Sequence, residues 1–171
     1  IQPEQEKRQA QKLADSLQGQ RHAKEIRDVF NRITYNSKKI QARHLFHYNI
    51  VLIGFMGSGK STISDYFSTM FAMETVEMDR IISEREGMSI SDIFALYGEE
   101  YFRNLETSLL VELQQKKNVV VSCGGGTPMR ENNVAEMKKG GKVVLLTAKP
   151  ETIYHRVKDS HDRPLLEGHM D

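Results

Sequence analysis

Short apolar runs alternate with stretches of helical periodicity along most of this chain. Four runs rich in Val, Ile and Leu are typical of buried strands: residues 49–53, 74–78, 118–122 and 142–147. The segments between them place apolar residues at helical spacing, as in residues 62–71 and 130–139. Regular strand–helix alternation predicts an α/β fold, a parallel sheet with helices on both faces.

The first 44 residues have a different pattern, of two amphipathic helices. One is expected to end near Gly19, and the other to run from about His22 to Arg43. Their apolar stripes are narrow and form no core, so they must pack on each other, on the rest of the chain or on another copy. We therefore predict a helical segment, 1–44, before an α/β domain, 45–171. The stripes comprise Ala10, Leu13, Ala14 and Leu17, then Ile26, Val29, Phe30 and Ile33.

A phosphate-binding motif follows the first predicted strand. Residues 54–61 read Gly-Phe-Met-Gly-Ser-Gly-Lys-Ser and match the P-loop pattern between a strand and a helix. Glycines allow a tight turn whose N–H groups face an anion, next to the positive end of the helix dipole. Lys60 can reach the β- and γ-phosphates, and Ser61 can hold Mg²⁺. The predicted nucleotide site comprises Gly57, Ser58, Gly59, Lys60, Ser61 and Thr62.

Asp79 follows the second predicted strand. Ligands of open α/β sheets bind outside the carboxyl ends of the strands, so this carboxylate could meet a substrate hydroxyl or a magnesium-bound water. It could also cap a helix beginning at Arg80. The two roles are compatible.

Arg103 and Glu106 are three residues apart on a predicted helix that starts after Gly98. At this spacing they share a face, and an arginine held by a glutamate presents a rigid fork to a carboxylate. The alternative is a surface ion pair, worth less than about 1 kcal/mol.

Three consecutive glycines, Gly124, Gly125 and Gly126, end the third predicted strand. Without side chains the backbone can approach a ligand closely, whereas the alternative is a bare flexible loop. We interpret the preceding Cys123 as a small buried apolar residue. Further on, residues 160–166 form a polar, proline-broken loop that could act as a lid and deliver Arg163 to a phosphoryl group.

Charge and cysteine content bound the location and the partners. Residues 1–44 contain ten Lys and Arg against five Asp and Glu, and the remainder fourteen against eighteen. The basic segment lacks interleaved aromatic residues, so we expect a solvated helix face and no nucleic-acid partner. A single cysteine, no signal peptide and no apolar run near the ~20 residues that span a bilayer predict a cytoplasmic protein without a membrane partner.

Together these motifs resemble the shikimate kinase family across residues 49–166. The resemblance rests on the P-loop, Asp79, the Phe-Arg-x-x-Glu motif ending at Glu106, the triple glycine, and Arg156 before an Arg-Pro-Leu-Leu motif beginning at Arg163. It implies a P-loop kinase that phosphorylates shikimate with ATP and Mg²⁺ in aromatic amino acid biosynthesis.

The resemblance also implies roles for individual residues. Lys60 and the loop amides hold the ATP phosphates, Ser61 ligates Mg²⁺, and Asp79 orients the shikimate hydroxyl. Arg103 binds the shikimate carboxylate with support from Glu106. The remaining roles are backbone contacts to the substrate from Gly124, Gly125 and Gly126, stacking on adenine by Arg156, and stabilisation of the transferred phosphoryl group by Arg163.

The sequence departs from the family pattern in two places. Glu77 stands where the family usually has an Asp that contacts magnesium through water. The chain also ends at Asp171, before a further helix, a substrate-binding arginine and a final strand. We therefore expect the kinase segment to lack its C-terminal end, and an enzyme truncated there to bind ATP and shikimate poorly.

Residues 29–41 resemble the last helix of the helical chorismate mutases, in which a Ser and a Gln one turn apart line the active site. Ser37 and Gln41 have this spacing. Residues 1–6 resemble the start of that family's middle helix, although its usual acidic residue and arginine fall on Gln2 and Gln5. The resemblance implies the rear part of a mutase domain, inactive alone, which would mediate self-association or pack on a mutase domain. The alternative is two amphipathic helices of similar composition.

Three functions remain open on this reading. The first is shikimate phosphorylation, and the second is phosphorylation of another small metabolite, as in gluconate kinase. The third is a non-catalytic nucleotide-binding or scaffold module. The Arg103–Glu106 pair and the triple glycine favour the first.

Overall fold

The structure is a computed structural model, and it describes residues 3–157. Eight segments of helix and four strands follow one another in this part of the chain, and their order agrees with the predicted alternation. The elements are α1 (Pro3–Ser16), α2 (Ala23–Leu45), β1 (Asn49–Ile53), α3 (Lys60–Phe71), β2 (Glu74–Glu77), α4 (Met78–Glu86), α5 (Ile90–Leu113), β3 (Val119–Ser122), the 3₁₀ turn η1 (Thr127–Met129), α6 (Glu131–Gly140), β4 (Gly141–Leu145) and α7 (Pro150–Val157).

The four strands form one parallel sheet in the order β2-β3-β1-β4. In the register, Leu52 of β1 is level with Ser122 of β3, and Glu77 of β2 is level with the same Ser122. The loops after β1, β2 and β3 therefore leave the sheet at one edge. The direction in which successive strands are added to the sheet reverses between β1 and β3, which is where doubly wound sheets bind their ligands.

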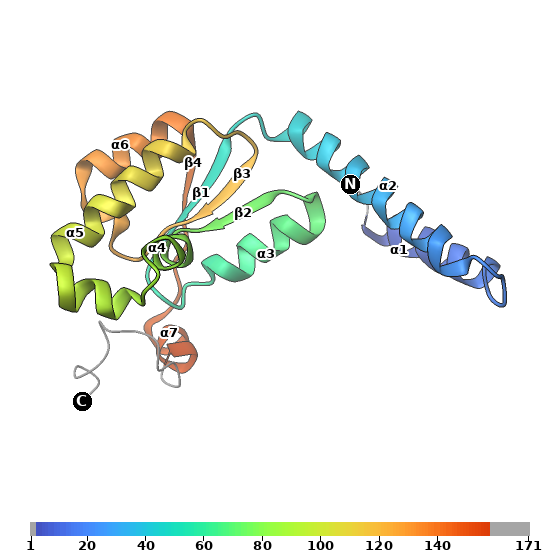
Figure 1. Cartoon of the computed structure of the whole chain (residues 1–171), viewed down its shortest axis with the longest axis horizontal. Helices are drawn as coiled ribbons and strands as arrows, with labels where there is room; N and C mark the ends of the chain where they lie inside the picture. Colours follow the sequence, from blue (N-terminus) through green and yellow to red (C-terminus); the bar gives the residue numbers. More distant parts are fainter. Residues whose placement is uncertain (1–2, 158–171) are drawn as a thin grey trace.

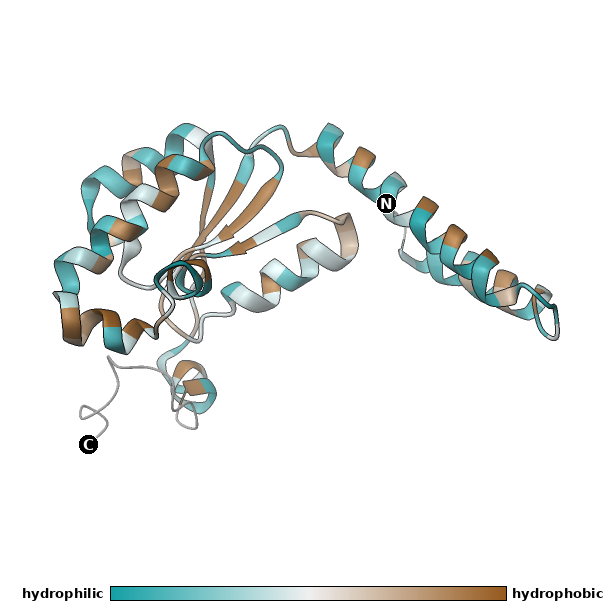
Figure 2. Ribbon diagram, in the orientation of Figure 1, coloured by the Kyte–Doolittle hydropathy of each residue, from teal (hydrophilic) through white to brown (hydrophobic). Residues whose placement is uncertain are grey.

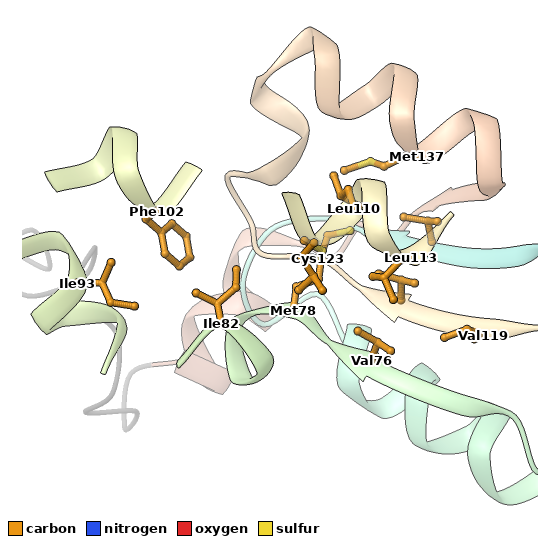
Figure 3. Close-up of a cluster of buried hydrophobic side chains, with 13 residues drawn as sticks. Val76, Met78, Ile82, Ile93, Phe102, Leu110, Leu113, Val119, Cys123 and Met137 are labelled. Atoms are coloured by element: carbon orange, nitrogen blue, oxygen red, sulfur yellow. The ribbon is translucent and has the colours of Figure 1, made fainter. Parts of the chain in front are cut away.

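Helices cover both faces of the sheet, as predicted (Figure 1). Alternate residues of a strand point to opposite faces, so Val51 and Val121 join one core and Ile50 and Val120 the other. The larger core packs α4, α5 and α6 on the sheet (Figure 3). The smaller core packs α3 and the end of α2 against the opposite face.

The α1–α2 hairpin extends away from the sheet and is mostly hydrophilic (Figures 1 and 2). Helix α1 has no buried residue, and α2 buries only Ala42. Lys38 of α2 pairs with Glu6 of α1 at 2.7 Å. The C-terminal end of α2 is held firmly, because Asn118 Nδ2 donates to the carbonyls of Ala42 (3.0 Å) and Phe46 (3.2 Å).

Local sequence signals set most helix boundaries, with one correction. Ser89 caps α5, its side chain accepting from the Asp92 amide at 3.1 Å, and Gly98 breaks that helix with φ 82° and ψ 167°. Helix α4 starts at Met78 rather than at Arg80, so Asp79 lies in its first turn and is not its cap. Within residues 3–157, every helix is too short or too polar to cross a bilayer.

Candidate functional site

The glycine-rich loop joins β1 to α3. Gly54, Gly57 and Gly59 all have positive φ. A side chain at Gly54 is excluded, since a Cβ there would lie 2.3 Å from the carbonyl oxygen of Leu146. Lys60 bends back over the loop, and its Nζ donates to the carbonyls of Gly54 (2.8 Å) and Phe55 (3.1 Å). The loop and the N-terminus of α3 thus form an anion-binding cradle.

Helix α7 closes one side of this loop. Arg156 is exposed, and its Nη1 donates to the carbonyl oxygen of Gly57 at 2.8 Å. Val157 is buried, and a Cβ on Gly57 would lie 2.9 Å from its Cγ1. The structure therefore brings Arg156 to the predicted nucleotide loop. Arg163 and its loop lie outside the described residues.

Side chains from α4, α5 and η1 converge on Gly124. A Cβ at this glycine would lie 2.7 Å from Asp79 Oδ1, 2.9 Å from Glu106 Oε1 and 3.2 Å from Thr127 Oγ1. Two of these groups are carboxyls, Asp79 from the first turn of α4 and Glu106 from α5. Glu77, at the end of β2, is partly buried. The predicted substrate residues Asp79, Glu106 and Gly124 are therefore neighbours.

Asp79 is in an environment that disfavours its charge. Asp79 is exposed as a whole residue, but its Oδ1 lies in the crowded space around Gly124, together with Glu106 Oε1 and Thr127 Oγ1. Burial is the main cause that raises the pKa of Asp79 above its ordinary value, and the negative charge of Glu106 adds to the effect. Lys60 and Arg103 act in the opposite direction. Such a carboxyl accepts a proton more readily than an exposed aspartate does.

Arg103 is held in a fixed orientation by two glutamates. Its Nη1 donates to Glu106 Oε2 at 2.8 Å, while Nε and Nη2 donate to Glu99 Oε1 at 3.0 and 2.8 Å. The Arg103 side chain is 13% exposed and that of Glu106 is 0% exposed, so the surface-ion-pair alternative is wrong. The rings of Phe94 and Phe102 lie 5.9 and 5.4 Å from the guanidinium carbon.

The last residue of the triple glycine, Gly126, packs directly against this guanidinium. A Cβ on Gly126 would lie 2.5 Å from Arg103 Nη2, although φ at Gly126 is an ordinary −89°. Gly126 is therefore required for space rather than for backbone conformation. Cys123 just before is buried, and burial raises the pKa of its thiol to about 12, in agreement with a packing role.

Sequence reasoning missed four polar residues of this cluster, Glu99, Thr107, Thr127 and Asn133. Glu99 lies one helical turn before Arg103, so the i,i+4 spacing could have revealed it. Thr127 and Asn133 are fully buried and reach the cluster only through the packing of η1 and α6 on α5. No pattern in the sequence marks that contact.

A magnesium ion would find few protein ligands here. Among residues 3–157 there is no group of three His, Cys, Asp or Glu placed to hold a metal. Ser61 and Glu77 offer a hydroxyl and one carboxylate. This sparse set fits Mg²⁺, which usually binds through one or two carboxylates together with substrate phosphates and waters.

Comparisons with known proteins agree on one family. The family model described as shikimate kinase matches residues 56–171. The shikimate kinase of Caldanaerobacter subterraneus is 39% identical over 118 residues, 69% of each chain. That of Sulfurihydrogenibium is 45% identical over 119 residues, 70% of this chain and 72% of the relative.

Solved structures lead to the same family. Shikimate kinase from Acinetobacter baumannii, solved in complex with shikimate, superposes with a TM-score of 0.68 at 34% identity and covers 71% of this chain and 68% of that one. The Aquifex aeolicus enzyme gives 0.62 at 42% identity, covering 72% and 73%. The chain with this phosphate-binding loop and buried arginine–glutamate pair belongs to the shikimate kinase family.

Proposed function

We propose that this protein transfers the γ-phosphoryl group of ATP to a hydroxyl of shikimate, forming shikimate 3-phosphate. One observation carries the proposal beyond family membership. The phosphate-binding loop opens at the same edge of the sheet as the cluster of Asp79, Glu106 and Arg103. A phosphoryl donor and an acceptor that bears both a hydroxyl and a carboxylate fit this pairing.

On the donor side, the loop amides and Lys60 bind the ATP phosphates. Lys60 exchanges its contacts with the Gly54 and Phe55 carbonyls for phosphate oxygens. Ser61, followed by Thr62 on α3, and Glu77 at the end of β2 would hold Mg²⁺, and the ion would neutralise phosphate charge. Arg156 lies against the nucleotide loop, and we assign it to stacking on the adenine. We assign Arg163 to stabilising the transferred phosphoryl group.

On the acceptor side, Asp79 orients the hydroxyl that attacks. Its raised pKa makes it a better proton acceptor, and its place beside Gly124 puts it at the cluster's centre. Because phosphoryl transfer needs little covalent help from the protein, positioning and electrostatics supply most of the catalysis.

Arg103 binds the substrate carboxylate. The guanidinium is nearly buried, flanked by aromatic rings, and fixed by Glu106, so it is organised before the substrate arrives. The peptide groups of Gly124, Gly125 and Gly126 contact the ring of the substrate.

Identification of the product tests this function. The protein is incubated with ATP and Mg²⁺ plus shikimate, shikimate methyl ester or gluconate, and ³¹P NMR follows new phosphomonoester signals. We expect a signal with shikimate and a strongly reduced one with the ester, which lacks the charge that Arg103 binds. Preference for gluconate would favour another metabolite kinase, and ATP binding without any product would favour the scaffold alternative.

We also infer a separate origin for residues 1–44, as a segment resembling the rear part of a helical chorismate mutase, before a kinase segment of residues 45–171. The family match begins at residue 56 and leaves α1 and α2 outside it. Ser37 and Gln41 are in contact at 3.3 Å and line one groove together with Gln5, Glu6, Gln9, Thr34 and Lys38. Chorismate titration of labelled protein should shift the amide signals of Ser37 and Gln41. Unchanged signals would favour two helices of merely similar composition.

A further inference from the structure

A ring of polar contacts, most of them hydrogen bonds, lies behind the guanidinium of Arg103. Glu106 accepts from Arg103 through one carboxylate oxygen and from the hydroxyl of Thr127 through the other. The carbonyl of Thr127 accepts from Asn133 Nδ2 at 2.9 Å. Thr107 Oγ1 lies 2.7 Å from Asn133 Oδ1 and 3.0 Å from the carbonyl oxygen of Arg103, and its single proton is donated to one of these two acceptors.

The ring ties three elements together. Arg103, Glu106 and Thr107 lie on α5, Thr127 on η1 and Asn133 on α6. Glu106, Thr127 and Asn133 are each 0% exposed, so water cannot replace a bond that is lost. Buried polar groups are stable only when they have partners, so the bonds of Glu106, Thr127 and Asn133 restrict the geometry of each of them.

The ring fixes the direction in which Glu106 holds Arg103. A buried carboxylate bonded on one oxygen alone could rotate about its side-chain torsions, and the arginine would follow it. The hydroxyl of Thr127 removes this freedom by holding the second oxygen. Asn133 in turn holds the backbone of Thr127, at the turn that follows the triple glycine.

We propose that Thr127 and Asn133 are positioning residues that set the geometry of the carboxylate-binding arginine. The inference rests on the proposed function, since it concerns the substrate carboxylate. Neither residue contacts the reacting atoms. Their loss should therefore weaken shikimate binding and leave ATP binding and the chemical step nearly unchanged.

Thr127→Val tests the inference, because valine keeps the shape of threonine and removes the hydroxyl. We expect the shikimate KM to rise about tenfold, which corresponds to part of the free energy that a hydrogen bond to a charged group contributes. The kcat and the ATP KM should stay within about twofold of the wild-type values. Thr127→Ser restores the hydroxyl and should restore most of the KM. Asn133→Asp keeps the acceptor but loses the donated bond, and should move the shikimate KM in the same direction.

Ser64→Ala is the matched control, since Ser64 is also a buried hydroxyl and belongs to α3, away from the ring. It should leave the shikimate KM unchanged. Circular dichroism melts verify that each variant is folded. A folded Thr127→Val protein with the wild-type shikimate KM would overturn the inference, as would equal changes in the shikimate and ATP constants.

A second readout separates this inference from the proposed function. In ¹⁵N-labelled protein without substrate, the Nη1–H group of Arg103, which donates to Glu106, should exchange with water about tenfold faster in Thr127→Val than in wild type, because Glu106 is less restrained. If wild type does not phosphorylate shikimate but this difference is seen, only the proposed function fails. If wild type is active and neither exchange nor KM changes, the positioning role fails.

Discussion

Replacing Arg103 with methionine should damage substrate binding and stability through separate causes. The methionine fills much of the space beside Phe94 and Phe102 but carries no charge. The substrate carboxylate then loses its fork, and Glu106 keeps a buried charge with Thr127 as its remaining partner.

The structure gives a magnitude for each effect. Two hydrogen bonds to a charged group, at about 1.5–3 kcal/mol each, correspond to a loss of at least about 10²-fold in kcat/KM for shikimate. A buried charge that loses its partner costs about 3–5 kcal/mol. At roughly 2–4 °C per kcal/mol for a chain of this size, the Tm should fall by about 6–20 °C.

A second substitution separates the two effects. Gln at position 106 still bonds the Thr127 hydroxyl but carries no charge, so Arg103→Met/Glu106→Gln should recover much of the lost Tm. Its activity with shikimate should stay low, because the carboxylate-binding group is still missing. Thermal melts and steady-state kinetics of the single and double variants measure both outcomes.

Two results would refute this reasoning. If Arg103→Met kept the wild-type kcat/KM for shikimate, the arginine would not be the carboxylate ligand. If the double variant were no more stable than Arg103→Met, the uncompensated charge of Glu106 would not be the cause of instability.

Three further substitutions test neighbouring groups. Asp79→Asn should abolish turnover yet raise the Tm at pH 7–8, because a carboxyl whose pKa is raised in the folded state destabilises that state when it is charged. The gain in Tm should shrink as the pH falls toward the ordinary aspartate pKa near ~3.9. An unchanged or lower Tm at pH 7–8 would contradict this. Glu99→Ala should change the shikimate KM less than about fivefold, because the Glu99 side chain is 62% exposed; a larger change in kinetic assays would make Glu99 a principal anchor. Gly126→Ala should cut kcat/KM for shikimate about 10²-fold, because the added methyl group would displace Arg103. Wild-type kinetics would contradict this and show that Arg103 accommodates the methyl group without losing its function.

The sequence was sufficient for the architecture because each element has a strong local signal. Buried parallel strands are continuous apolar runs, and the P-loop pattern fixes a strand, a turn and a helix together. The capping signal at Ser89 and the break at Gly98 are equally local. The start of α4 was predicted wrongly: a cap at Asp79 would place the first helical residue at Arg80, whereas the helix begins at Met78.

The site could be predicted only where its residues are close in the sequence. Arg103 and Glu106 share a helix, so their pairing follows from their spacing, although their burial does not. Thr127 and Asn133 join Glu106 and Thr107 across separations of 21 and 26 residues, through the packing of three elements. Such contacts depend on tertiary structure, and neither residue type indicates them.

The central claim is that ATP and shikimate meet between the P-loop and the Asp79–Arg103 cluster. The most direct test measures ADP release with ATP and Mg²⁺, with and without shikimate, beside a Lys60→Ala control. We predict release that depends on shikimate and is lost in the control. Release at the same rate without shikimate, or undiminished release in Lys60→Ala, would contradict the account.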